Sequence, residues 1–109
     1  MTHISISPEN GYYTTINIFR TTPENQRALA DTLAGADGML REHPGFVGAA
    51  VHVSHDGATV VSYVQWEKED AFHAMRQHPE AQGHFHTVKD LVSSVDSIAC
   101  SVTYTHDKS

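Results

Sequence analysis

The stretch of residues 54–67, which reads S-H-D-G-A-T-V-V-S-Y-V-Q-W-E, decides the fold of this chain. It begins with Asp56-Gly57, a pair typical of a hairpin turn, and continues with the period-two alternation of a strand. Because side chains on a strand point alternately to opposite faces, one face should carry Val60, Ser62, Val64 and Trp66. A hydroxyl and an indole among valines fit either an ordinary core or the floor of an apolar pocket.

Strand-like and helix-like patterns alternate along the rest of the chain. Three further segments alternate like strands: 12–20, 46–53 and 97–105. Thr22-Pro23 is a typical helix start, and the apolar stripe behind it continues to Leu40. After the third strand the pattern predicts two short helices, separated at His78-Pro79.

The resulting order, β-α-β-β-α-α-β, predicts an α+β fold of the ferredoxin-like, split βαβ type. In this fold a four-stranded antiparallel sheet carries its helices on one face. The 109 residues suffice for one domain. We expect this domain to span residues 12–105, preceded by a flexible lead-in (1–11) and followed by a polar tail (106–109).

The sheet face turned away from the helices is expected to be too apolar to face water. Its predicted apolar residues are Ile16, Ile18, Val47, Val51, Val53, Val61 and Tyr63. Such a face needs a partner, and a second copy of the chain would supply one. We therefore expect a homodimer in which two sheets pack face to face.

The composition argues against several classes of function. The formal net charge is −6, and the seven Lys and Arg residues are scattered, which disfavours nucleic acid as a partner. No apolar run approaches the ~20 residues of a membrane span, and the N-terminal residues lack a signal-peptide pattern. Cys100 is the only cysteine, so no internal disulfide can form. These features predict a cytoplasmic protein without a membrane partner.

Asn17 lies in the middle of the first predicted strand, where asparagine is disfavoured. The first and third strands are neighbours in a split βαβ sheet, so Asn17 and Ser62 can lie side by side on the face of Trp66. The amide could be satisfied by a loop backbone, and the indole could simply fill the core. Alternatively, the amide donates to an oxygen of a bound ligand.

Two segments, R-E-H-P-G-F-V-G-A (41–49) and H-V-S-H-D-G-A-T-V-V-S-Y-V-Q-W-E (52–67), resemble the antibiotic biosynthesis monooxygenase family. The similarity is strongest to the small anthrone oxygenases of aromatic polyketide pathways. It extends over residues 12–104, and its most specific part is D-G-x-x-V-V-x-Y-x-Q-W, residues 56–66. The resemblance implies a dimeric α+β barrel with a cavity in each subunit between sheet and helices.

The resemblance also implies an activity. Anthrone oxygenases of this family oxidise polycyclic phenols to quinones with molecular oxygen and use no metal, flavin or haem. The residues held responsible are an asparagine on the first strand, another on the third strand and the tryptophan of the Q-W pair. Asn17 and Trp66 match the first and the last, whereas Ser62 replaces the third-strand asparagine and offers one hydroxyl donor. Phe72 stands where some members have a tyrosine.

This activity needs no cofactor, and the chain contains no G-x-G-x-x-G, P-loop or C-x-x-C motif. The expected substrates are a small aromatic, anthrone-like molecule, which carries the reactivity itself, and molecular oxygen. Asn17 and Ser62 would stabilise the substrate anion, and Trp66 would orient its rings.

Nine histidines are the other conspicuous feature of the chain. His84 and His86 lie two apart on a predicted helix and cannot chelate one ion, so we expect no metal site. His52 and His86 are the candidates for a general base in the cavity, because a neutral imidazole accepts a proton near physiological pH. The apolar residues expected to contact the substrate are Phe72, Met75 and Phe85.

Two other functions fit parts of the pattern. A haem-degrading branch of the same superfamily also has a first-strand asparagine, and His84 could be its histidine ligand. That branch has a tryptophan in the helix where this chain has Phe72 and Met75. The second alternative is a non-catalytic dimeric domain that binds an aromatic metabolite or assists a partner enzyme.

Overall fold

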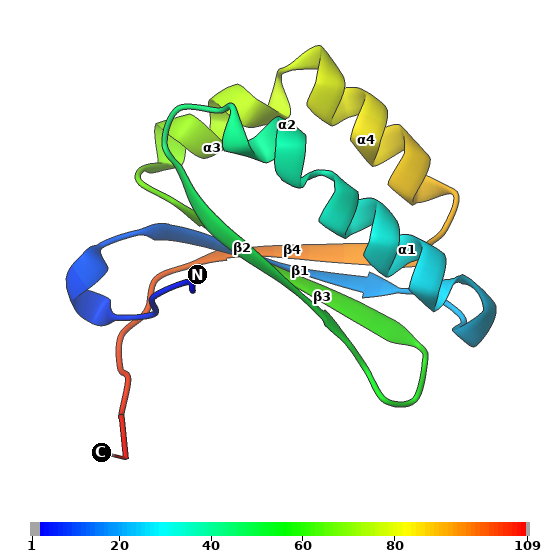
Figure 1. Ribbon diagram of the computed structural model, residues 1–109, viewed down its shortest axis with the longest axis horizontal. Helices are drawn as coiled ribbons and strands as arrows, with labels where there is room; N and C mark the ends of the chain where they lie inside the picture. The colour runs from blue at the N-terminus through cyan, green and yellow to red at the C-terminus, as the bar shows by residue number, and fades with distance from the viewer. Residues whose placement is uncertain (1–2, 109) are drawn as a thin grey trace.

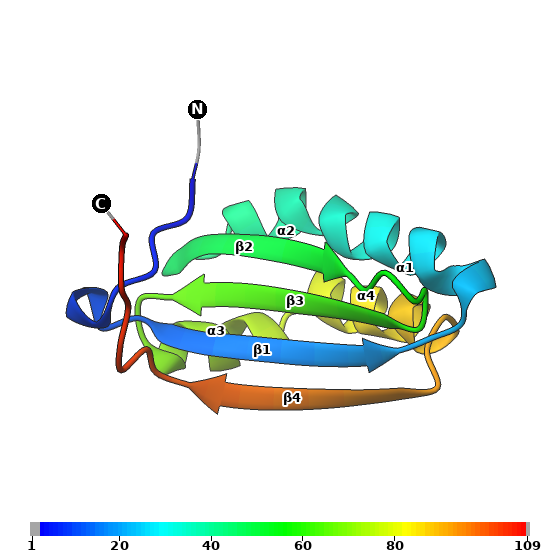
Figure 2. The ribbon, with the colours of Figure 1, turned by 90° about the horizontal axis from the view of Figure 1, so that it is seen from below.

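The computed structural model describes residues 3–108 and contains one antiparallel sheet with helices on one side (Figure 1). Its elements are η1 (Pro8–Asn10, a 3-10 helix), β1 (Tyr13–Arg20), α1 (Pro23–Gly35), α2 (Asp37–Arg41), β2 (Phe46–Val53), β3 (Thr59–Trp66), α3 (Glu69–Arg76), α4 (Pro79–Lys89) and β4 (Ser94–Cys100). The four strands lie in the order β2-β3-β1-β4. A view from below shows one bare face of the sheet with the helices α1 to α4 behind it (Figure 2). The predicted ferredoxin-like α+β fold is confirmed.

The two central strands pair in the register that alternation predicts. Asn17 of β1 lies opposite Ser62 of β3, and Phe19 lies opposite Val60. Phe19 and Val60 pack against Leu29 of α1, which shows that this face is the one turned toward the helices. Asn17 and Ser62 therefore lie between sheet and helices, as expected.

The turn between β2 and β3 is fixed by the Asp56-Gly57 pair. Gly57 has a φ of +80°, a left-handed conformation that residues with a Cβ rarely adopt. Asp56 Oδ1 accepts hydrogen bonds from Ser54 Oγ at 2.7 Å and from the Ala58 backbone N–H at 3.0 Å. These bonds stabilise the carboxylate and lower the pKa of Asp56.

The last strand differs from the prediction in its bounds. It spans Ser94–Cys100 rather than residues 97–105. Cys100 pairs with Thr14, close to the beginning of β1, so the chain beyond Cys100 has no strand beside it to pair with. The first predicted helix also differs, because it is interrupted at Ala36, between α1 and α2. Gly35, a poor helix former, ends α1 directly before the break.

Beyond Phe46, the two faces of β2 are the reverse of those predicted. The pairing of β2 with β3 shifts between Phe46 and Gly48, so that a β-bulge adds one residue to β2. Beyond the bulge, Val51 lies opposite Ser62 and shares the face toward the helices. The placement of Val51 and Val53 on the bare face was therefore wrong, because one extra residue exchanges the two faces of a strand.

The buried core forms two separate clusters with the centre of the sheet between them. One cluster contains Phe19, Leu29, Val60 and Val88, and the other contains Val64, Trp66, Met75 and Ala81. Along β3, Ser62 stands between Val60 of the first cluster and Val64 of the second. The apolar packing is thus interrupted where the polar side chains lie.

The bare face of the sheet is only partly covered. The segments next to both termini lie across the same end of this face (Figure 2). Gln65 Nε2 donates to the backbone carbonyl of Ser5 at 2.7 Å, which joins the N-terminal segment to β3. Ile98 remains 48% exposed on the uncovered part. Among the helices of residues 3–108, none is long and apolar enough to cross a membrane.

Candidate active site

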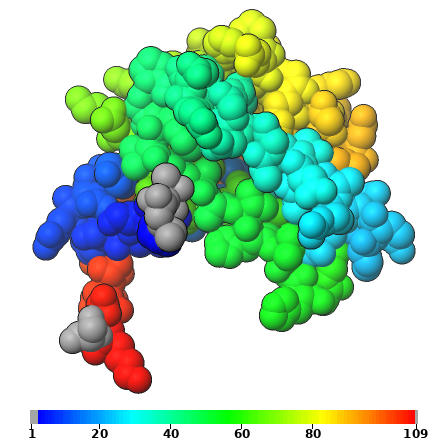
Figure 3. Space-filling model, in the orientation of Figure 1, coloured from blue at the N-terminus to red at the C-terminus, as the bar shows by residue number. Residues whose placement is uncertain are grey.

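A cavity of about 400 Å³ lies between the sheet and the helices, where the two core clusters separate. Its floor comes from the four strands and its opposite walls from α1 to α4. The space-filling view shows the molecule hollowed between β2 and the helices α1 and α2 (Figure 3). A cavity of this size is typical of sites for small organic molecules.

One rung of the sheet crosses the floor of the cavity on all four strands. This central rung consists of Val51, Ser62, Asn17 and Ser97, and all four residues line the cavity. Asn17 Nδ2 donates to Ser62 Oγ at 2.9 Å, and Ser97 Oγ donates to Asn17 Oδ1 at 2.7 Å. The asparagine that looked out of place in the sequence is therefore the middle member of a three-residue hydrogen-bonded chain.

Trp66 lines the cavity four residues beyond Ser62 on the same face of β3 and is fully buried. Its ring makes edge contacts with Phe46, at 5.6 Å between centroids, and with Phe72, at 6.2 Å. The indole Nε1–H is buried without a hydrogen-bond acceptor in the described part of the chain. Such a donor costs about 1–3 kcal/mol when unpaired, so an acceptor on a bound molecule would stabilise it.

Three other predicted contact residues also line the cavity: Phe72, Met75 and Phe85. Met75 is buried, whereas Phe85 is 45% exposed at the surface of α4. Phe72 packs against Tyr13 at 5.6 Å between ring centroids, and the Arg76 guanidinium lies 5.5 Å from its centroid. Aromatic rings therefore enclose the Trp66 end of the cavity.

Both histidines predicted to reach the cavity lie elsewhere. His52 lies opposite Val61 on the bare face of the sheet, because the β-bulge exchanges the faces of β2. His86 is exposed on α4 and does not line the cavity. Neither placement supports a direct role for these two side chains in the site.

His84 is the histidine of α4 that lines the cavity. It is half-buried, and this burial lowers its pKa below the ordinary value of 6.5, because burial disfavours the charged imidazolium. The ring is therefore neutral at pH 7 and able to accept a proton. Its position could have been found from the sequence, since His84 stands three residues after buried Ala81 and four before buried Val88.

Two cations complete the lining, and no carboxylate does so among the described residues. Arg76 ends α3 and Lys89 ends α4, where positive charge also complements the helix dipole. In the described part of the chain, neither cation forms an ion pair with a carboxylate. The cavity thus favours a neutral or anionic ligand over a cation, although the whole chain is acidic.

Within residues 3–108, no three His, Cys, Asp or Glu side chains converge in a group that could hold a metal ion. The cavity offers amide, hydroxyl, imidazole and indole groups in an apolar surround. These groups can bind an oxygen of an aromatic molecule, accept one of its protons and contact its rings.

Comparison with known proteins assigns the chain to a family. Residues 12–87 match the family described as antibiotic biosynthesis monooxygenase. The chain is 42% identical over 101 residues to tetracenomycin-F1 monooxygenase of Streptomyces glaucescens, a match that covers 92% of this chain and 89% of that protein.

Solved structures show the same fold. One is a monooxygenase from the gene ActVA-Orf6 of Streptomyces coelicolor, solved in complex with nanaomycin D. Its TM-score is 0.83 and its sequence identity is 24%, and the match covers 93% of this chain and 96% of that one. Another is SnoaB of Streptomyces nogalater, described as a cofactor-independent oxygenase, with a TM-score of 0.74 and 19% identity over 87% of this chain and 96% of that one.

Proposed function

Because the chain belongs to the antibiotic biosynthesis monooxygenase family, we propose that it is a cofactor-independent monooxygenase that oxidises a polycyclic, anthrone-like phenol to a quinone. The observation that carries this proposal is the cavity itself, in which Asn17, Ser62 and Trp66 lie on one sheet face. The relative with 42% identity, tetracenomycin-F1 monooxygenase, supports the same class of reaction.

The floor of the cavity provides hydrogen-bond donors for the substrate oxygen. Asn17 Nδ2 has two hydrogens and gives one to Ser62, which leaves the second free. The Ser62 hydroxyl hydrogen is also free, because its oxygen accepts from Asn17. Both donors bind a carbonyl oxygen more strongly as it gains negative charge, which favours removal of a proton from the adjacent ring carbon.

We assign the acceptance of this proton to His84, which takes the place of the predicted bases His52 and His86. The resulting carbanion is delocalised as a phenolate and transfers one electron to O₂. Superoxide and the substrate radical combine to form a C–O bond, and protonation gives a hydroperoxide. Loss of water breaks the O–O bond and removes the second proton from the carbon. In sum, a CH₂ group and O₂ become a C=O group and H₂O.

The homodimer remains part of the proposal. The bare face carries Ile16, Val61 and Ile98, and a second sheet packed on it would remove these side chains from water. The cytoplasmic location expected from the composition also remains a prediction.

The proposal is tested by aerobic incubation of the protein with dithranol, a model anthrone, with quinone absorbance and oxygen consumption as readouts. Spontaneous oxidation in buffer is subtracted. Burial lowers the pKa of His84 below its ordinary value of 6.5, and the ring must be neutral to accept the proton, so the protein-dependent rate should fall only at a pH below 6.5. The variant His84→Gln should lose most of the rate, by roughly 100-fold for a general base.

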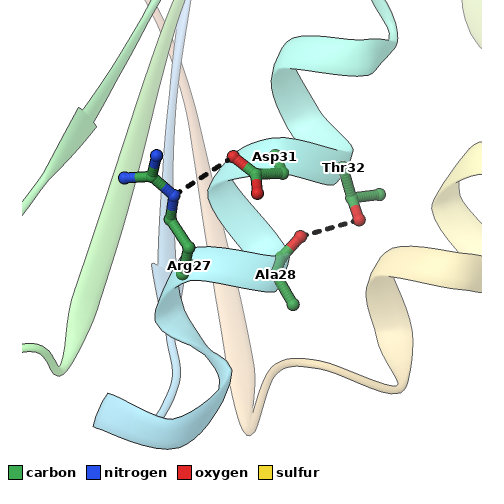
Figure 4. A network of polar contacts seen from close by, with 4 residues as sticks. All are labelled: Arg27, Ala28, Asp31 and Thr32. Carbon is green, nitrogen blue, oxygen red and sulfur yellow. Dashed lines mark hydrogen bonds and ion pairs between the residues drawn. The ribbon is translucent and has the colours of Figure 1, made fainter.

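The matched control is Arg27→Gln on the outer side of α1. Arg27 Nε lies 3.5 Å from Asp31 Oδ1, and neither residue lines the cavity (Figure 4). The variant removes one charge and should keep the wild-type rate. Saturable quenching of the single tryptophan, Trp66, by dithranol without any turnover would instead identify a non-catalytic binding protein.

A further inference from the structure

We infer that the cavity takes a substrate with an ionised acid group, and that Lys89 at the open side of the cavity binds this group. The inference rests on the proposed function and narrows its substrate class to polycyclic phenols that carry a carboxylate on an outer ring. Lys89 ends α4 and lines the cavity. It sets the specificity of the site and takes no part in the chemistry.

One side of the cavity is open to solvent. Val95 and Ser97 of β4 both line the cavity, yet both are exposed. Figure 2 shows the helices behind β1, β2 and β3, whereas most of β4 has no helix behind it. On α4, Phe85 and Lys89 stand one helical turn apart, and they too are both exposed and in the lining. The opening therefore lies between α4 and β4, with Lys89 on its rim.

The end of the cavity at Trp66 is closed and aromatic. Trp66 is fully buried there, and Met75 is buried beside it. Arg76, the other cation of the lining, already contacts the ring of Phe72 with its guanidinium. Burying an ionised carboxylate costs much free energy, so the acid group of a ligand belongs at the side that water still reaches. The rings of the ligand then occupy the aromatic end.

The Lys89 ammonium has no partner in the described part of the chain. It forms neither an ion pair nor a side-chain hydrogen bond. Asp90 and Asp96 follow it closely in the sequence, but neither lines the cavity. Three of the four arginines, by contrast, have a carboxylate or hydroxyl partner: Arg20, Arg27 and Arg41. A ligand carboxylate at the rim would thus meet an unpaired positive charge and form a charge-assisted hydrogen bond.

The distance from the central rung to the rim suits a substituent on an outer ring. Val95 pairs with Phe19, which stands two residues beyond Asn17 along β1, or about 7 Å at the rise of a strand. An anthrone whose carbonyl oxygen binds at Asn17 can place a carboxylate on its outer ring at a similar offset. Lys89 also neutralises this carboxylate, whose charge would otherwise oppose formation of the substrate anion.

The test compares dithranol with its carboxylic acid derivative, rhein anthrone. The measured quantity is the ratio of kcat/KM for the acid to kcat/KM for dithranol, so that each variant is compared with wild type on the same two substrates. Lys89→Gln should lower this ratio by about 5- to 10-fold, as expected for one charge-assisted hydrogen bond at a partly hydrated site. Lys89→Glu should lower it further. Lys89 is exposed, so neither variant endangers the fold.

Two variants serve as controls for this ratio. Lys68→Gln removes the same charge from a residue outside the lining, and it should keep the wild-type ratio. Arg76→Gln should keep the ratio as well, because Arg76 packs on Phe72 at the closed end. A ratio that falls in Arg76→Gln but not in Lys89→Gln would overturn the assignment of Lys89. A ratio that is unchanged in both would overturn the acid site altogether.

A binding measurement without oxygen separates this inference from the proposed function. Quenching of the single tryptophan, Trp66, under anaerobic conditions gives the dissociation constants of both probes. Wild type should bind rhein anthrone several-fold more tightly than dithranol, and Lys89→Gln should lose this preference. If neither probe is turned over in air but this pattern holds, the proposed function fails and the acid site stands. If dithranol is turned over but wild type and Lys89→Gln share one ratio of dissociation constants, the acid site fails and the proposed function stands.

Discussion

The two faces of the sheet differ in how fully their buried polar side chains are hydrogen-bonded. On the cavity side, Asn17, Ser62 and Ser97 bond to one another and keep donors free for a ligand. On the bare side, three polar atoms are buried without a partner in the described part of the chain: Thr14 Oγ1, Tyr63 OH and Gln65 Oε1. On the cavity side, the described part of the chain leaves one such group unpaired, the indole Nε1–H of Trp66.

The difference indicates what each face binds. The central rung is preorganised, as a site for a small molecule must be if its donors are to act without rearrangement. On the bare side, Thr14 and Gln65 line a small second cavity of about 80 Å³ below the two terminal segments, which is large enough for ordered water. Tyr63 does not line it, and its hydroxyl is buried within the single chain without a hydrogen-bond partner in the described residues.

The largest effect is expected from lysine substitutions on the two faces of β4, which test whether the bare face is the dimer interface. Val95 and Ile98 are similarly exposed, at 43% and 48%, but Val95 lines the cavity and Ile98 lies on the bare face. Ile98→Lys should weaken the homodimer on the order of 100-fold, because it places an unpaired charge in an apolar interface. Val95→Lys should leave the dimer intact. Light scattering across a dilution series measures both, and equal behaviour would mean that the bare face is not the interface.

The next test removes groups from the cavity face alone. Asn17→Ala and Trp66→Phe should each lower dithranol turnover by about tenfold or more, since each removes a donor or a ring surface from the site. Both variants should remain dimers, because neither residue lies on the bare face. Steady-state rates and light scattering on the same samples check this. Unchanged rates in both variants would contradict the assignment of the cavity as an active site.

The sequence predicts those parts of the fold and the site that depend on local alternation, and it does not predict those that depend on pairing between distant strands. The alternation of β1 and β3 correctly placed Asn17 beside Ser62 and on the face of Trp66, because each strand sets its own faces. The face of His52 could not be read, because a bulge at Phe46–Gly48 depends on pairing with another strand. Ser97 was missed as a site residue for the same reason: its place in the rung is fixed by the register of β4 on β1.

The choice between His84 and His86 turned on helix rotation. Side chains two residues apart on a helix point about 200° apart. A small error in the predicted inward face therefore places the cavity-lining histidine in solvent and the solvent-exposed one in the cavity. Phe85 was expected to point inward with His86 beside it, whereas the inward face in fact includes His84. Ala81 and Val88 were correctly expected to face inward, and their spacing from His84 was the signal that favours this histidine over His86.

The smallest expected effect concerns the hydroxyl of Tyr63. Because this hydroxyl is buried inside the single chain without a hydrogen-bond partner in its described part, a second subunit cannot reach it; Tyr63→Phe should therefore leave the dimer and dithranol turnover unchanged and stabilise the fold by about 1–3 kcal/mol. Phenylalanine keeps the ring and its packing, so the change isolates the hydroxyl. The dimer dissociation constant is measured by dilution, with Arg27→Gln as the matched surface control. A dimer weakened several-fold would mean that the hydroxyl does bond to the partner subunit, and a urea unfolding midpoint no higher than that of wild type would mean that the hydroxyl is already paired within the chain.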